Sequence, residues 1–245
     1  MLALEELGFP TLHMIHMYAY ESEEILQMWT DKLVNPALEK KEAIVGRADF
    51  KLIADSGYQA VADFPACLMY EQILEEFPDS KFILTTRESS EVWFRSWATL
   101  TTSTSKSFYL GGLIFPVLNR YSNYMRWLNA VVNKDPSYLT SNFPKDVTIK
   151  ENAIASYEEH NQRVRKLIPP AQLLEFNVED GWDALCTFLE IEDCPTTPFP
   201  KSNSARSMRA QTFSAFWVAV LFLVFVIYKV RKSCNKKNVV KGKIA

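Results

Sequence analysis

Short apolar runs alternate with amphipathic stretches in the middle of the first half of this chain. The run Ala60–Ala62 precedes a helical segment, Pro65–Phe77. A second apolar run, Lys81–Thr86, precedes a segment rich in Ser and Trp, Ser89–Leu100. This order predicts a strand, a helix, a strand and a helix, which favours an α/β fold built on a parallel sheet with flanking helices.

The remaining pattern adds helices, one further strand and two polar segments. The pattern predicts helices over Met1–Leu7, Glu21–Leu33, Pro36–Val45, Lys150–Leu167 and Trp182–Leu189, a helical turn over Phe50–Ala54, and a helix over Phe108–Val132 that is interrupted near Pro116. Leu173–Phe176 predicts a last strand. The Ser/Thr-rich run Thr101–Ser107 predicts a loop, and the Pro/Ser-rich segment Cys194–Arg209 predicts a linker.

Two charged residues directly follow the apolar runs of the strand–helix–strand unit. Asp63 follows the first run, and Arg87 follows the second. Because ligands bind at the carboxyl ends of the strands in such sheets, we expect both on adjacent strand tips, in a site that handles an anion. Each residue also has a structural interpretation. Asp63 is suited to cap the helix that begins near Pro65, and Arg87 to pair with Glu88 or Glu91.

The stretch from Tyr58 to Trp97 resembles the core of sulfotransferases that use 3′-phosphoadenosine 5′-phosphosulfate. Further landmarks of that family follow in order: Tyr157-Glu-Glu-His160-Asn161, Ile168-Pro-Pro170, Gly181-Trp182 with Leu185-Cys186, and Pro198-Phe-Pro200 with Asn203. The Asp-aromatic-Pro at Asp63 resembles one branch in particular. Its members are P-loop sulfotransferase-like proteins often labelled NAD-dependent epimerase/dehydratase or nucleotide-sugar epimerase. The resemblance covers Leu2 to Ser204.

The resemblance implies roles for five residues. Arg87 and Ser96 would hold the 3′-phosphate of the cofactor, although their spacing is one residue longer than in the cytosolic enzymes. Asp63 occupies the position of the catalytic base, which takes the proton from the acceptor. Lys201 and Asn203 would reach the cofactor phosphates.

A phosphate-binding loop typical of the family is missing from this sequence. The family begins with a strand and a loop of the form G-x-x-R-T-G-T, whose backbone N–H groups bind the 5′-phosphosulfate. The glycines stand at positions 8, 46, 57, 111, 112, 181 and 242, and none builds such a loop. We therefore expect a P-loop nucleotide-triphosphate-hydrolase-like sulfotransferase fold without its first strand and phosphate loop. Such an N-terminally truncated chain would have a gap or a rearrangement in its sheet, and little or no sulfuryl transfer.

An uncharged stretch, Ala210 to Tyr228, lies near the C-terminus. A helix of this length spans roughly 28 Å, close to the hydrocarbon thickness of about 30 Å. The sequence therefore predicts a sulfotransferase-like domain (1–204), a linker (205–209), one transmembrane helix (210–228) with membrane lipid as its partner, and a basic tail (229–245). The positive-inside rule places the tail in the cytosol. Tail-anchored insertion and the absence of an N-x-S/T sequon favour a domain in the cytosol instead.

Charge, cysteine spacing and missing motifs argue against three other classes of protein: nucleic-acid-binding proteins, metalloproteins and nucleotide kinases. Residues 1–209 carry a net charge of −9 and residues 210–245 a net charge of +7, so the acidic body argues against nucleic-acid binding. The cysteines and histidines show no metal-binding spacing, and we expect no metal. Cys67 and Cys186 are expected as buried thiols rather than disulfide halves. The absence of a Walker lysine motif argues against a nucleotide kinase.

Two functions remain. The first is a membrane-anchored sulfotransferase-like protein, whose family reaction moves a sulfuryl group to an acceptor hydroxyl or amine of a small molecule or glycan. The alternative is a non-catalytic, membrane-tethered nucleotide-binding or scaffold protein. The aromatic residues of Phe108–Leu128 permit a lipid-like or aromatic acceptor without identifying one. Trp93 and Trp97 either stack on an adenine or pack in the core.

Overall fold

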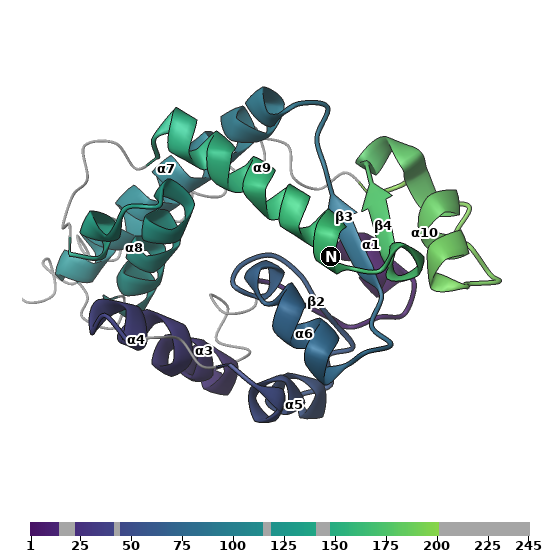
Figure 1. The fold of residues 1–245 in the computed structure, drawn as a ribbon, viewed down its shortest axis with the longest axis horizontal. Helices are drawn as coiled ribbons and strands as arrows, with labels where there is room; N and C mark the ends of the chain where they lie inside the picture. Colours follow the sequence, from purple (N-terminus) through teal and green to yellow (C-terminus); the bar gives the residue numbers. More distant parts are fainter. Residues whose placement is uncertain (15–22, 42–44, 115–118, 141–147, 201–245) are drawn as a thin grey trace, which may run out of the picture. The chain divides into compact units, whose positions relative to one another are not determined.

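A computed structural model describes residues 1–14, 23–41, 45–114, 119–140 and 148–200 (Figure 1). These residues belong to one compact unit, Met1–Lys201. The predicted linker, membrane helix and basic tail lie outside the described residues. Within the described residues, no helix combines the length and the apolar composition needed to cross a bilayer.

Four short strands form two separate parallel pairs. β1 (Thr11–Leu12) pairs with β2 (Ala60–Val61), and β3 (Phe82–Thr85) pairs with β4 (Leu173–Phe176). The parallel pairing confirms the α/β class. In the described part of the chain no ladder joins β2 to β3, so the expectation that their tips are neighbours in one sheet is wrong.

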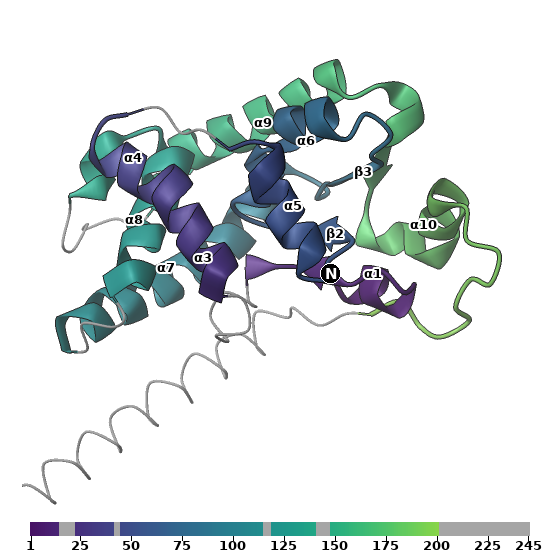
Figure 2. The same cartoon turned by 90° about the horizontal axis from the view of Figure 1, so that it is seen from below.

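Helices make up most of the remaining described structure. They are α1 (Leu2–Glu6), α3 (Glu23–Trp29), the π-helical turn η1 (Thr30–Val34), α4 (Asn35–Leu38), α5 (Arg47–Asp55), η2 (Ala66–Leu68), α6 (Tyr70–Glu76), α7 (Ser90–Ile114), α8 (Asn119–Asn133), η4 (Pro136–Leu139), α9 (Lys150–Leu167), η5 (Pro170–Gln172), η6 (Val178–Asp180) and α10 (Gly181–Leu189). Helices α7, α8 and α9 pack on one another (Figure 1). η1, between α3 and α4, also contacts α8 (Figure 2).

The predicted loop at Thr101–Ser107 is wrong, because α7 continues through it. The Thr101 hydroxyl donates to the carbonyl oxygen of Trp97, four residues earlier, at 2.8 Å. Ser105 is fully buried and accepts a hydrogen bond from Asn129 Nδ2 of α8 at 3.0 Å. Packing against α8 and local hydrogen bonds therefore override the weak helix propensity of Ser and Thr.

The described residues have two apolar clusters of different size. The larger one contains Trp29, Tyr124 and Leu128, and Leu12 of β1 belongs to it. The smaller one joins Leu84 of β3 to side chains of α6 and of the end of α9. Each large side chain buried in these clusters contributes about 1.5–3 kcal/mol to stability. The β1–β2 pair is therefore fixed by the main core, and the β3–β4 pair by the minor one.

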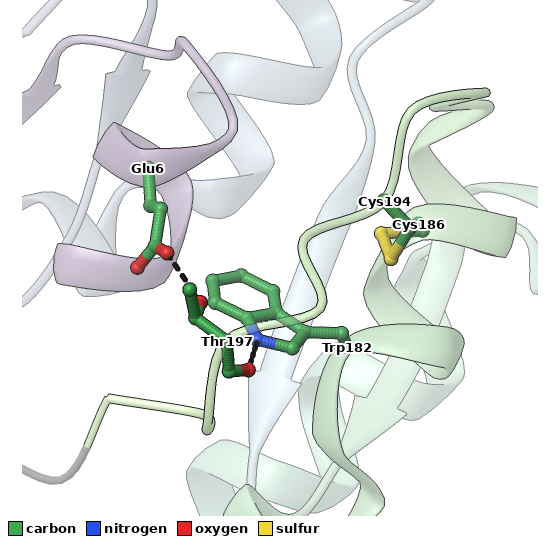
Figure 3. Close-up of a disulfide and its surroundings, with 5 residues drawn as sticks. All are labelled: Glu6, Trp182, Cys186, Cys194 and Thr197. Carbon is green, nitrogen blue, oxygen red and sulfur yellow. Dashed lines mark hydrogen bonds between the residues drawn. A yellow bond between two sulfur atoms is a disulfide. The ribbon is translucent and has the colours of Figure 1, made fainter.

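A disulfide joins Cys186 of α10 to Cys194 (Figure 3). The expectation that Cys186 is a buried thiol is therefore wrong. The physical reason is the turn after α10, where Glu190 adopts a left-handed conformation (φ 60°) and brings the chain back toward the helix. Cys67 is a free cysteine.

The segment after this turn is also held by hydrogen bonds. Trp182 Nε1 donates to the carbonyl oxygen of Thr197 at 2.8 Å, and the Thr197 hydroxyl donates to Glu6 Oε1 of α1 at 2.7 Å (Figure 3). The Phe199 ring packs on Trp182 with 4.8 Å between centroids. The expectation of a linker over Cys194–Arg209 is therefore wrong for residues 194–200, which are part of the folded unit.

Candidate functional site

The structure places the two main candidate residues where the sequence predicted them, just beyond strand ends. Asp63 follows β2, and Arg87 follows β3. They belong to different strand pairs. The candidate site therefore has two parts, the β2 tip and the β3 tip.

At the β2 tip, the Asp63 carboxylate is held in one orientation. Its Oδ1 accepts the backbone N–H of Phe64 at 2.8 Å, and its Oδ2 lies 3.4 Å from Nε2 of His13. The backbone of Asp63 has φ 66°, a left-handed conformation that few residues other than glycine adopt. The side chains of His13 and Asp63 remain 25% and 28% exposed, so both are accessible from solvent.

His13 was not predicted as a site residue. It follows β1, which is only two residues long, and only the pairing of β1 with β2 brings it beside Asp63. One feature of the sequence could have identified His13 as a site residue. It directly follows Thr11-Leu12, just as Asp63 directly follows the run Ala60–Ala62.

Burial raises the pKa of the Asp63 carboxyl above its ordinary value of 3.8. His13, the hydrogen bond from Phe64 N–H and the amine of Met1 oppose this rise and hold the pKa down. A carboxyl with a raised pKa is a stronger proton acceptor than an ordinary aspartate once it is ionised. Burial also raises the pKa of the neighbouring Cys67 thiol well above 9.0, so this thiol stays protonated at neutral pH.

At the β3 tip, Arg87 is exposed. Its backbone N–H donates to the hydroxyl of Tyr157 at 3.3 Å. Glu91 binds Lys150 Nζ at 2.8 Å instead of Arg87, and no ion pair of the described residues includes Arg87. The structural interpretation of Arg87 as an ion-pair partner is therefore wrong, and its guanidinium is available for an anion. Ser96 is exposed on α7, two turns into that helix.

Four aromatic rings connect the two tips; we call them the aromatic bridge. Phe64 contacts Trp97 with 5.5 Å between ring centroids, Trp97 stacks with Trp93 at 5.6 Å, and Trp93 stacks with Tyr157 at 4.4 Å. The bridge thus runs from the residue next to Asp63 to the residue that accepts the Arg87 N–H. Both tryptophans pack on protein rings, which favours the core interpretation over stacking on an adenine.

Other candidate features lie elsewhere. Lys201 and Asn203 are outside the described residues. A shallow hollow beside the start of α10 is lined by Val178, Glu179, Gly181, Pro198 and Phe199, and includes none of the predicted site residues. Among the described side chains, no group of three or more His, Cys, Asp or Glu residues is placed to hold a metal ion.

The chain is an α/β protein with parallel strands and flanking helices. Its candidate site residues lie at the carboxyl ends of the strands. The sulfotransferase domain family matches residues 1–208, so the chain belongs to that family. Ava biosynthesis cluster protein M of Aspergillus versicolor is 28% identical over 175 residues. The matched region covers 65% of this chain and 60% of that relative, so the chain spans about 60% of the length of the curated relative it matches.

Proposed function

We propose that this chain is a sulfotransferase-like protein whose strand tips bind a nucleotide donor and an acceptor hydroxyl or amine. The observation that carries the proposal is Arg87, an exposed guanidinium at the end of β3 with no carboxylate partner among the described residues. In this family the donor, 3′-phosphoadenosine 5′-phosphosulfate, supplies the sulfuryl group.

The donor groups of the chain suit a 3′-phosphate. The planar guanidinium of Arg87 can bind two phosphate oxygens in parallel, which is the strong form of a charge-assisted hydrogen bond. The exposed hydroxyl of Ser96 would add a second donor, and Lys201 and Asn203 are further proposed ligands. Asp63 is the proposed base, because its carboxylate is fixed and its pKa is raised by burial.

We further propose that transfer by this chain is slow or undetectable. Transfer of a group with dispersed negative charge depends on positioned donors, by analogy with phosphoryl transfer. The sequence has no glycine-rich loop to supply them. One positioned donor contributes about 3 kcal/mol of transition-state stabilisation, so transfer without such donors would be slow.

The second candidate function is a non-catalytic, membrane-tethered nucleotide-binding or scaffold protein. The division of the described strands into two separate pairs favours this alternative. It would keep the fold, with or without the phosphate contact at Arg87.

Calorimetric titration of the full chain with 3′-phosphoadenosine 5′-phosphate tests both functions. Binding that is lost in Arg87→Ala supports the nucleotide site, whereas no binding at millimolar nucleotide leaves only the scaffold. Transfer of radiolabelled sulfate from the donor to phenol and alcohol acceptors is measured on the same preparation. Transfer that depends on Arg87 would overturn the proposal that the chain is inactive.

The acceptor and the membrane anchor belong to the same proposal. The relative is named for a biosynthesis cluster, which favours a small-molecule acceptor. We propose residues 210–228 as the membrane anchor because they contain no charge. A reporter fused after Ala245, combined with protease protection, determines on which side of the membrane the domain lies.

A further inference from the structure

The parallel pairing of β1 with β2 brings two titratable side chains to one sheet edge. Leu12 is opposite Val61, and the backbone N–H of Ala62 donates to the carbonyl oxygen of Leu12 at 2.8 Å. His13 follows β1 directly, Asp63 follows β2 after Ala62, and both lie beyond the carboxyl end of the strand pair. Their side chains meet there, with 3.4 Å between Nε2 and Oδ2.

The structure around Asp63 restricts its carboxylate to this pairing. The Phe64 N–H occupies Oδ1, and the Cys67 N–H donates to the Asp63 carbonyl oxygen at 2.9 Å. The left-handed backbone of Asp63 is a conformation that costs free energy and tends to occur at functional sites. Oδ2 of Asp63 therefore faces His13, while hydrogen bonds hold Oδ1 and the carbonyl oxygen of the same residue in place.

Three groups of the described residues shift the pKa of Asp63 besides its burial. They are His13, the backbone N–H of Phe64 and the amine of Met1, and Asp63 itself raises the pKa of the Cys67 thiol. Glu5 acts on the same amine. His13 directly follows β1, Met1 directly precedes α1, and Cys67 lies in η2. Of the charged groups, His13 lowers the pKa of Asp63 more than the Met1 amine does.

We propose that His13 and Asp63 act as one acid–base pair, in which His13 positions the Asp63 carboxylate and shares the proton that this carboxylate takes from an acceptor. This inference rests on the proposed function and adds His13 to its site as a positioning residue. As the acceptor O–H bond breaks, the acceptor oxygen bonds to sulfur and the bond from sulfur to the nucleotide phosphate breaks. The proton goes to the His13–Asp63 pair, and the nucleotide leaves with the electron pair of the broken bond.

Nitrogen-15 NMR of the full chain labelled at histidine tests the pair directly. The His13 ring signal is assigned by its loss in His13→Gln and titrated in the wild type and in Asp63→Asn. An anionic partner within 4–6 Å shifts a pKa by about one unit or more, so Asp63→Asn should lower the pKa of His13 by that amount. Asp55→Asn is the matched control, because the Asp55 carboxylate binds Lys51 at 2.7 Å, and it should leave the titration unchanged. A His13 pKa that is the same in Asp63→Asn and in the wild type would overturn the proposal.

The reciprocal measurement remains available if Asp63→Asn does not fold. In His13→Gln, the carbon-13 signal of the Asp63 carboxyl should titrate at higher pH than in the wild type, because the imidazolium no longer stabilises the anion. An unchanged carboxyl titration would also overturn the proposal.

Binding of 3′-phosphoadenosine 5′-phosphate separates this inference from the proposed function. Coupled titration without nucleotide binding supports the pair and contradicts the sulfonucleotide site. Binding that depends on Arg87 together with uncoupled titration contradicts the pair and leaves the proposed function standing. A role of His13 confined to packing would not shift the Asp63 titration.

Discussion

The β2 tip and the β3 tip each carry one charged residue, but their surroundings differ. Asp63 is partly buried, accepts a hydrogen bond from the backbone N–H of Phe64 and is paired with His13. Arg87 is exposed, and its guanidinium forms no ion pair among the described residues. Burial and pairing adjust a proton affinity, whereas an exposed cation attracts an anion without a desolvation cost. The contrast supports the proposed proton chemistry at the first tip and the proposed anion binding at the second.

The largest expected effect comes from breaking the aromatic bridge between the tips. Trp93→Ala removes a ring that stacks on both Trp97 and Tyr157, and we expect the free energy of unfolding to fall by about 3 kcal/mol. Urea denaturation measures the loss. Trp93→Phe keeps a ring and should lose much less. An unchanged denaturation midpoint in Trp93→Ala would mean that the bridge does not support the tips.

Removal of the disulfide should leave both tips unchanged. Cys194→Ser opens a loop closed by residues eight apart, and we expect a stability loss of about 2.5 kcal/mol. Wild-type protein with reductant should show the same loss in thermal denaturation. The His13 titration and the nucleotide affinity should not change, and a change in either would show that the C-terminal segment is coupled to the site.

Arg87→Ala tests the β3 tip alone. Loss of a hydrogen bond to a charged group costs about 2 kcal/mol, so affinity for 3′-phosphoadenosine 5′-phosphate should fall roughly 30-fold in calorimetry. Stability should stay the same because Arg87 is exposed. Arg95→Ala, also exposed on α7, is the matched control. An equal loss in that control, or equal binding of adenosine 5′-monophosphate, would indicate general charge attraction instead of a 3′-phosphate site.

The smallest expected effect is a pH dependence at the β2 tip. Because the pKa of Asp63 is raised in the folded protein, folding favours its protonated form. Wild-type stability should therefore fall as pH rises from 3.8 through the folded-state pKa, by about 1.4 kcal/mol for each pKa unit of elevation. Asp63→Asn keeps the acceptor for Phe64 N–H and should not show this fall. If the free energy of unfolding of the wild type and of Asp63→Asn changed with pH in the same way from pH 3 to 8, the raised pKa of Asp63 would be contradicted.

The strand tips were predictable because they depend on local sequence. β2, β3 and β4 were found because their apolar runs are bounded by Pro, Asp, Arg or Asn. The helix Lys150–Leu167 was found with its observed limits, because its apolar residues recur at helical spacing. Asp63 and Arg87 follow from the ends of these runs.

What was missed depends on contacts between distant segments. β1 has two residues, too few for a pattern, and its pairing alone places His13 beside Asp63. The helical course of Thr101–Ser107 depends on burial against α8. The division into two strand pairs depends on which strands form hydrogen bonds with each other. The apolar runs predict where strands lie but not which strands pair.

The bond between Cys186 and Cys194 has a consequence for where the domain is found in the cell. Disulfides persist in oxidising compartments and are reduced by the thiols of the cytosol. We therefore propose that the domain lies in a lumen or outside the cell. This agrees with the basic residues after position 228 lying in the cytosol, and it opposes the tail-anchored orientation. The oxidation state of Cys186 and Cys194 therefore reports the compartment of the domain. Alkylation in freshly lysed cells adds mass to the reduced cysteines only, so mass spectrometry distinguishes the two states.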